Sequence, residues 1–434
     1  MGLDAAVRAA CTDTAGAHTV DADGQVLETF RADDDGGDGF IADIEILRGD
    51  LSRVLYDDTR DGVEYVFGDR IAELAQDADG VDVVFAGGNR RRFDLVVGAD
   101  GLHSELRAMV FGPHERFLRH LEHVLAFYSV PNEFGLDRWL LEYRDQESGR
   151  SALLRPIQDA TRAMAMFYFP SADFDVDHRD VAAQKVLLRE RMAGLGWLTP
   201  DILAHLDDTP DFYLDQVAQV VMDRWSSGRV GLLGDAAFSS SPMSGQGTGL
   251  ALVGAYLLAG ELAAAGWDPD AGFARYEARM RSFVEANQEI GRLNARSRDL
   301  PGQTPSRAPI SPANGSPSWS GARSTASSCP TTRGCRTPQP GPDRRSPRRP
   351  SRRCHITCRE GPRFSRTPPD DLRSGRMVRV GAPVRRPGHV PMRRCWLGKL
   401  TRSMRFHRAG VSVVLSLAWS ALTGADKTIG TSTP

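Results

Sequence analysis

Apolar residues in the first hundred positions follow a helical spacing and then a strand-like spacing. Residues 41–56 predict an amphipathic helix. Its apolar stripe consists of Ile46, Leu47, Leu51, Val54 and Leu55. The runs 63–67, 81–85 and 93–97 predict short strands, and Gly87-Gly88-Asn89 predicts a hairpin turn. The last run is apolar almost throughout, which is typical of a central strand covered on both faces.

Residues 113–226 have a different pattern. Alternating and aromatic-rich runs such as 124–128 and 163–169 predict an antiparallel sheet, accompanied by helices near 181–195 and 200–206. Beyond it, the pattern returns to a buried strand at 230–233. Two helices are then expected, an apolar one at 250–265 and an amphipathic one at 273–290.

This order predicts an α/β fold. A doubly wound parallel sheet is expected from residues 1–112 and 227–300, with the antiparallel β-rich domain of residues 113–226 inserted between its two parts. Residues 301–434 form a separate tail.

Charge and proline content set the tail apart. Residues 1–300 carry 29 Lys+Arg against 51 Asp+Glu, whereas residues 301–434 carry 25 against 5 and hold 18 of the 26 prolines. Such a composition buries too little apolar surface to offset the entropy of ordering, so we expect a disordered basic Pro/Arg/Ser-rich tail. Lysine occurs 3 times against 51 arginines, which indicates GC-rich coding; a shifted reading frame would produce such a tail.

Three features of the tail superficially resemble a metal site, a nucleic-acid-binding segment and a membrane span, and we expect none of these. Cys354-His355-x-x-Cys358 has no second ligand pair at zinc-finger spacing, so no metal is predicted. The arginine-rich stretches lack aromatic residues and a recognisable module, so no specific nucleic acid is expected. The apolar run 411–422 is short for a membrane span.

The first 300 residues favour a cytoplasmic location. They contain one cysteine, Cys11, so no disulfide framework is predicted. The N-terminus has neither the basic start nor the apolar core of a secretory signal.

The strongest chemical signal follows the strand predicted at 230–233. Gly234-Asp235 lies at the carboxyl end of this strand, where an acid can accept hydrogen bonds from a ribose or ribityl hydroxyl. Glycines then open a long helix, whose N-terminal N–H groups favour negative charge. The run Gly228–Ala237 continues to Pro242, Gly245, Gln246, Gly247 and Thr248.

A second signal follows the strand predicted at 93–97. Asp100-Gly101 predicts a tight turn with a carboxylate at its corner, and Ser104 is placed to cap the next helix. Arg107 is placed either to stabilise the turn or to meet a phosphate. Taken alone, this segment also fits a plain strand–turn–helix. Together, the two signals place Asp beside Gly at two strand ends of one parallel sheet.

Both segments resemble the para-hydroxybenzoate hydroxylase-like (class A) FAD-dependent monooxygenases. The run Gly228–Ala237 is similar to the family's GD motif and the run Asp94–Arg107 to its DG motif. The run 241–248 resembles tetracycline-inactivating members. Arg48 resembles the family's flavin-contacting arginine, although a solvated helix residue is the alternative. The resemblance covers roughly residues 3–300.

The resemblance implies roles for the residues that match. Asp235 would hold the ribityl or ribose region of FAD, and Arg48 would lie along the flavin. Asp100 and Gly101 would help shape the flavin and nicotinamide sites. Pro242, Gly245, Gln246, Gly247 and Thr248 would line the pyrophosphate and the isoalloxazine edge. No side chain can be assigned a catalytic role.

The sequence departs from the family pattern in three places. Position 238 is Phe where the family commonly has His, and position 248 is Thr where it often has Asn. Neither change removes a backbone contact. In addition, no strand–Gly-x-Gly-x-x-Gly–helix unit, which binds the ADP half of FAD, precedes Arg48. We therefore expect an N-terminally truncated copy with an incomplete FAD-binding sheet.

The function implied is an FAD-binding, NAD(P)H-dependent monooxygenase. It would hydroxylate an aromatic or polyketide-like small molecule with O₂ through a flavin C4a-hydroperoxide, the cofactor carrying the chemistry. Two alternatives remain open. One is a flavin-dependent reductase or dehydrogenase on the same fold, and the other is a non-catalytic remnant that binds no FAD.

Overall fold

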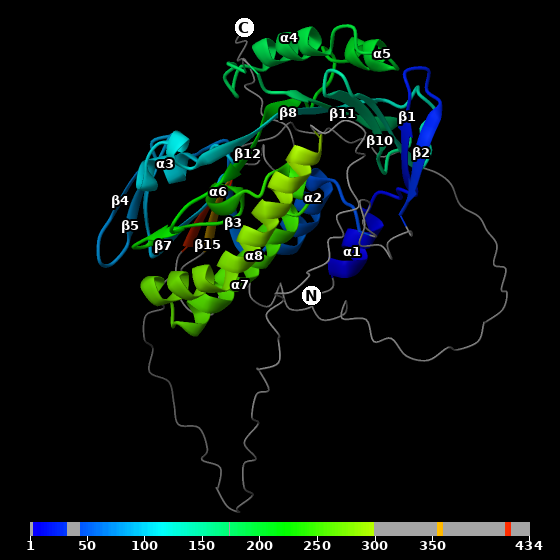
Figure 1. Cartoon of the computed structure of the whole chain (residues 1–434). Coiled ribbons are helices and arrows are strands. Elements are labelled where there is room, and N and C mark those ends of the chain that lie inside the picture. The colour runs from blue at the N-terminus through cyan, green and yellow to red at the C-terminus, as the bar shows by residue number, and fades with distance from the viewer. Residues whose placement is uncertain (1–2, 33–43, 173, 299–353, 359–412, 418–434) are drawn as a thin grey trace, which may run out of the picture.

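Two large β-sheets organise the chain (Figure 1). The structure, a computed structural model, describes residues 3–32, 44–172, 174–298, 354–358 and 413–417. The seven-stranded sheet has the order β12 (Tyr213–Val220), β8 (Leu118–Pro131), β11 (Arg162–Pro170), β10 (Arg150–Pro156), β9 (Trp139–Asp145), β1 (Gly16–Val20) and β2 (Val26–Arg31). The six-stranded sheet has the order β13 (Ser226–Ser227), β14 (Val230–Leu232), β7 (Leu95–Ala99), β16 (Val413–Leu417), β15 (Cys354–Cys358) and β3 (Val63–Phe67).

The six-stranded sheet is parallel apart from the short β13–β14 hairpin. Leu95, Val96 and Val97 of β7 are consecutive and all buried, as the sequence predicts for a strand covered on both faces. Helices α7 (Gly247–Ala264) and α8 (Pro269–Arg298) pack on this sheet, to whose core α8 contributes Phe273 and Met280. The α/β fold with a parallel FAD-type sheet and an inserted antiparallel sheet is thereby confirmed.

Two strands of the six-stranded sheet come from the tail. β16 pairs with β7, and β15 lies between β16 and β3, all in parallel register. The disorder expected for residues 301–434 therefore does not extend to these two stretches, and the other tail residues lie outside the described part. β15 and β16 satisfy the backbone groups along the facing edges of β3 and β7, which would otherwise be unpaired.

The N-terminal hairpin also differs from expectation. Strands β1 and β2 extend the seven-stranded sheet rather than belonging to the first part of the flavin domain, residues 1–112. Gly16 to Val20 pair in parallel with Trp139 to Tyr143, and the His18 and Trp139 rings stack with centroids 4.2 Å apart. Backbone pairing and ring stacking therefore place this hairpin at the edge of the inserted domain.

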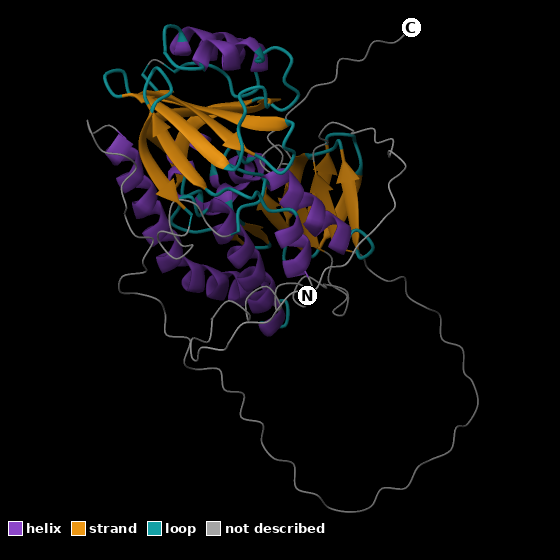
Figure 2. Ribbon diagram, turned by 90° about the vertical axis from the view of Figure 1, so that its right-hand side faces the viewer, coloured by secondary structure: helices purple, strands orange, loops and turns teal. Residues whose placement is uncertain are grey.

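Helices cover one face of the seven-stranded sheet. α4 (Val181–Met192) and α5 (Thr199–Ala204) lie above it, on the side away from α7 and α8 (Figure 1). Alternate residues such as Val124, Ala126 and Phe167 share a core with Leu188 and Ile202 of these helices. The residues between these in each strand point to the opposite face of the seven-stranded sheet. That face is turned toward the six-stranded, flavin-type sheet, which lies against it in the turned view (Figure 2).

The remaining elements cover and connect the sheets. They are α1 (Leu3–Ala9), α2 (Arg48–Thr59), α3 (Glu105–Phe111), α6 (Asp235–Phe238), and the three-stranded sheet of β4 (Ile71–Gln76), β5 (Val81–Phe85) and β6 (Arg90–Phe93). The predicted hairpin turn joins β5 to β6, with Gly88 at φ +87°. α2 begins later than its apolar stripe, because Ile46 instead forms an isolated bridge with Cys11. Within the described residues, α7 is the one helix with the length and apolar composition of a membrane span.

Candidate functional site

Asp100 closes the turn after β7. Its Oδ1 accepts a hydrogen bond from Ser104 Oγ at 2.6 Å, and its Oδ2 accepts one from the Leu106 N–H at 3.0 Å. Ser104 in turn caps α3 by accepting from the Arg107 N–H at 2.9 Å, as predicted. Gly101 adopts φ +82°, a conformation that favours glycine. Both Asp100 oxygens are thus used to shape the loop.

The Arg107 side chain links this loop to the motif Gly228–Ala237 by hydrogen bonds. Its side chain is fully buried and donates to the carbonyl oxygens of Leu102 at 2.6 Å and Ala236 at 3.0 Å. Burial lowers the pKa of Arg107 to about 10. Of the two roles that the sequence leaves open for this arginine, the structure shows stabilisation of the turn.

Asp235 begins α6, directly after Gly234, which has φ +63°. No N–H or O–H group of the described residues hydrogen-bonds to its carboxylate. A Cβ atom on Gly247 would lie 3.9 Å from Asp235 Oδ1, so the carboxylate is adjacent to the first residue of α7. The structure therefore brings together the two halves of the longest sequence motif.

The N-terminus of α7 is open. Pro242 begins a short 3₁₀ turn, Pro242–Ser244, and Gly245 follows with φ +66° and no atom within 4 Å of a Cβ position. The Gln246 side chain makes no capping hydrogen bond, and Thr248 is exposed. The first N–H groups of this long helix are thus free of a side-chain cap, at the end where the helix dipole favours an anion.

The charges of Arg48 and Asp235 both act on the Tyr213 phenol. Arg48 is the first residue of α2, and Tyr213 is the first residue of β12. Burial and then Asp215 raise the pKa of Tyr213 well above its ordinary value, Arg48 opposes this shift, and Asp235 adds to it. The two predicted flavin-site residues therefore act on one phenol that belongs to the second sheet.

One row of side chains crosses the seven-stranded sheet from this phenol. The pairing of neighbouring strands places five residues side by side on the face turned toward the flavin-type sheet. They are Tyr213, Phe127, Met166, Leu153 and Glu142. The rings of Phe127 and Tyr213 stack with centroids 4.7 Å apart. The face is therefore aromatic and apolar in its middle.

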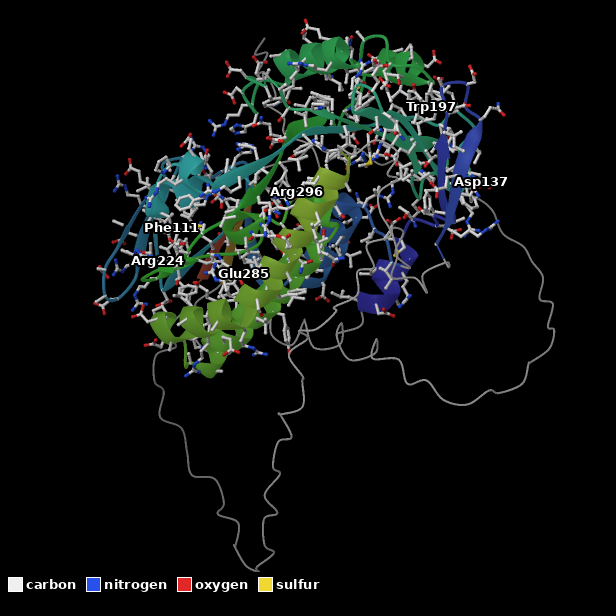
Figure 3. The ribbon with its side chains drawn as sticks, in the orientation of Figure 1. Phe111, Asp137, Trp197, Arg224, Glu285 and Arg296 are labelled. Carbon is white, nitrogen blue, oxygen red and sulfur yellow. The ribbon has the colours of Figure 1, made fainter. Side chains whose placement is uncertain are left out.

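Charged groups gather at the far end of this row. Arg298 lies 3.3 Å and Arg144 3.6 Å from Glu142 Oε1, and Arg155 pairs with Glu45. Burial, followed by the charge of Arg298, lowers the pKa of Arg144. Three guanidinium groups against two carboxylates give this end an excess of positive charge. Figure 3 shows Arg296 near the end of α8, where the helix reaches the second sheet.

The residues present fit one end of FAD. The Asp235 carboxylate and the uncapped α7 suit hydroxyl and phosphate oxygens, and Arg48 adds a cation. The sheet order β3-β15-β16-β7-β14 matches the 3-2-1-4-5 order of doubly wound dinucleotide-binding folds, in which the first strand precedes the glycine-rich phosphate turn. Here β16 takes that position, and Ala418, Trp419 and Ser420 follow it. Residues 1–434 thus contain groups that would suit the flavin end of the cofactor but no Gly-x-Gly-x-x-Gly turn for its ADP end.

A parallel sheet flanked by helices, with acid and glycine at two strand ends, is typical of a dinucleotide-binding protein. Residues 44–290 match the family described as "FAD binding domain". The chain is 45% identical over 309 residues to an uncharacterized protein of Mycobacterium tuberculosis, covering 70% of this chain and 80% of that protein. It is 40% identical over 279 residues to a flavin-dependent monooxygenase of Legionella longbeachae, covering 63% and 69%.

A solved structure supports the same family. The crystal structure of the tetracycline destructase Tet(51) superimposes with a TM-score of 0.62 at 35% identity, over 68% of this chain and 76% of that one. The chain belongs to the FAD-dependent monooxygenase family, whose cofactor is FAD.

Sequence reasoning missed Tyr213 and its neighbour Asp215. Their spacing in Tyr213-Leu214-Asp215 is the ordinary alternation of a strand, and nothing in it shows that both side chains face the flavin motifs. Within the described residues, no three or more His, Cys, Asp or Glu side chains form a cluster that could hold a metal ion.

The half-buried carboxylate of Asp235 leads to a prediction about flavin affinity. We expect Asp235→Ala to weaken FAD binding by about 1.5–3 kcal/mol, because flavin hydroxyls lose a charged acceptor. Titration of flavin fluorescence measures the change. Asp201→Ala, which removes an exposed carboxylate from the first turn of α5, is the matched control and should leave the affinity unchanged. Equal affinity of Asp235→Ala and the unaltered chain would assign Asp235 a structural role.

Proposed function

We propose that this protein is an NAD(P)H-dependent monooxygenase that hydroxylates an aromatic or polyketide-like small molecule. The observation that carries the proposal is the aromatic and apolar row of the second sheet, in which the Phe127 and Tyr213 rings stack and whose Tyr213 phenol feels the charges of Arg48 and Asp235. A ring on this row would lie between the flavin motifs and the inserted domain.

The overall reaction consumes NAD(P)H, a proton, O₂ and the aromatic substrate, and yields NAD(P)⁺, water and the hydroxylated ring. FAD, when bound, supplies the hydride acceptance and the oxygen transfer. The chain's own residues bind the cofactor and orient the substrate. Asp235 and α7 hold the cofactor's polar end, while Phe127, Met166 and Leu153 provide an apolar surface for the ring.

The charged end of the row suggests what else the substrate carries. Arg144, Arg155 and Arg298 lie beyond the apolar residues with two carboxylates among them, so an acidic or enolic oxygen on the substrate would be favoured there. The similarity to a tetracycline destructase supports a multi-ring molecule with several such oxygens.

The test separates three outcomes. The full chain is incubated with FAD, its flavin spectrum is recorded after gel filtration, and NAD(P)H oxidation is followed under ¹⁸O₂ with a panel of phenolic compounds. We expect one ¹⁸O atom in a product. NAD(P)H oxidation without oxygen incorporation would instead indicate a reductase or dehydrogenase. Absence of both flavin and turnover would indicate a non-catalytic remnant.

A further inference from the structure

Two buried glutamines hold the start of the loop that connects α6 to α7. Gln219, on β12, donates from Nε2 to the Ser240 carbonyl oxygen at 3.1 Å. Gln288, on α8, donates to the Ser239 carbonyl oxygen at 3.3 Å. Arg292 Nη1 donates to Gln219 Oε1 at 3.1 Å, and because a guanidinium has no acceptor, this contact fixes which end of the amide faces the loop. The two amides therefore bind the loop through its backbone oxygens.

The other carbonyl oxygens of the loop are also occupied. Asn294 Nδ2, near the end of α8, donates to the Met243 carbonyl oxygen at 2.9 Å. The carbonyl oxygens of Ser241 and Pro242 accept from N–H groups at the 3₁₀ turn, at 3.2 and 3.0 Å. Every carbonyl oxygen from residue 239 to residue 243 thus accepts a hydrogen bond within the protein.

The free backbone groups that follow the loop are donors. The first hydrogen bond inside α7 runs from the Leu250 N–H to the Gln246 carbonyl oxygen at 2.9 Å. The N–H groups of residues 247–249 are therefore not used within the helix. A ligand at this corner meets the positive ends of backbone dipoles, because the carbonyl oxygens of the loop are held by other partners.

The backbone of Ser241 is strained in this arrangement. Its φ of +72° and ψ of 158° lie in a region that is essentially restricted to glycine. Its Oγ is buried without a hydrogen bond among the described residues, so the side chain does not compensate for the strain. A relaxation of φ at Ser241 would turn the peptide group that joins it to Ser240, whose carbonyl oxygen Gln219 holds. The Gln219 amide therefore opposes this rotation.

We propose that Gln219, Gln288 and Asn294 are positioning residues that set the redox preference of a flavin bound at this loop. At neutral pH the oxidised isoalloxazine ring is neutral, whereas its two-electron-reduced form carries a negative charge. A loop whose carbonyl oxygens are held and whose free groups are N–H donors favours the negative form. When one of the amides is removed, a released carbonyl oxygen is free to turn toward the α7 N-terminus, where its negative end opposes the same charge.

The inference rests on flavin binding at the α7 N-terminus and not on the proposed substrate. The amides exchange neither protons nor electrons with the ring, so no chemical step is added. A flavin-dependent reductase or dehydrogenase would show the same preference as a monooxygenase. Failure of the proposed hydroxylation would therefore leave this inference standing.

Riboflavin is the probe for the test, because it carries the ring and the ribityl chain but no ADP half. Its dissociation constant from the full chain is measured by fluorescence titration in the oxidised form and by anaerobic calorimetry after photoreduction. By linkage, the ratio of the two constants gives the shift of the midpoint potential on binding, about 30 mV for each factor of ten in a two-electron couple. We expect the unaltered chain to bind the reduced form more tightly.

Asn294→Leu is the first variant, because Asn294 is half-buried and its replacement leaves the core of the fold in place. It should lower the preference for the reduced form about tenfold, the size of one lost hydrogen bond. Gln219→Leu should lower it at least as much. The matched control is Asn287→Leu, since Asn287 Nδ2 donates to the Phe283 carbonyl oxygen at 2.8 Å, within α8 itself. The control should keep the ratio of the unaltered chain.

A second substitution separates redox tuning from simple loosening of the loop. Ser241→Gly removes the strain, because glycine adopts the observed φ without a steric cost. Gln219→Leu combined with Ser241→Gly should therefore recover most of the preference that Gln219→Leu alone loses. Equal weakening of both forms of riboflavin in Asn294→Leu and Gln219→Leu would overturn the inference, because the amides would then only keep the loop folded. Absence of riboflavin binding to the unaltered chain would overturn it as well.

Discussion

A chimera that carries a relative's strand–Gly-x-Gly-x-x-Gly–helix–strand unit ahead of Leu3 is expected to bind FAD about 10²–10⁴-fold more tightly than the polypeptide of residues 1–434. The added turn would offer backbone N–H groups to the pyrophosphate. Two charge-assisted hydrogen bonds, at about 1.5–3 kcal/mol each, account for a gain of this size. The chimera omits residues 301–434, because β15 and β16 take the two places in the sheet that the new strands need.

Fluorescence titration of FAD against both proteins measures the difference. The control is the same chimera with the second glycine of the turn replaced by valine, whose side chain would hold the pyrophosphate away from the backbone. It should fold equally well and lose most of the gain. One equivalent of FAD retained by the 434-residue polypeptide through gel filtration would contradict the prediction and show that Asp235 and the α7 N-terminus suffice.

Gly291→Ala is expected to destabilise the fold by roughly 1–3 kcal/mol, the usual effect of overpacking a buried contact. Gly291 lies on α8 where the helix crosses the loop before α7. A Cβ atom there would lie 2.4 Å from the Ser240 carbonyl oxygen, a backbone atom that cannot turn away. Relieving this clash would move the loop that carries Pro242 and Gly245, so the affinity for flavin should fall together with Tm.

Gly260→Ala is the matched control for this substitution. Gly260 also lies inside a helix, α7, but no atom lies within 4 Å of its Cβ position. Alanine should there stabilise the helix by about 0.5–1 kcal/mol, because it restricts the unfolded chain more than glycine does. Urea unfolding of both variants gives the comparison. A Gly291→Ala protein as stable as Gly260→Ala would mean that α8 does not pack this tightly against the loop.

The strands that carry Asp100 and Asp235 could be predicted from the sequence. β7 and β14 are short, continuously apolar and followed by glycine, and these are local signals that do not depend on the rest of the chain. The cap at Ser104 was predictable for the same reason.

Other parts of the site depend on contacts between distant segments. The sequence leaves Arg107 with two possible roles, because nothing local shows that the Ala236 carbonyl lies 3.0 Å from its guanidinium. The strand alternation around Tyr213 predicts two faces of a sheet but does not indicate what each face meets. Likewise, the β1–β2 hairpin has the pattern of any hairpin, and its partner β9 lies far along the chain.

The placement of β15 and β16 has a consequence for how the protein is made. The middle of the parallel sheet pairs β7 and β3 with segments that are translated only after residue 300. At about 5–20 residues per second, synthesis of residues 301–434 takes on the order of ten seconds, during which the facing edges of β7 and β3 have no partner from the tail. Open edges of apolar parallel strands are sites of aggregation, so the nascent chain is exposed to aggregation through that interval. A chain released before Val413 would keep one of these edges open permanently.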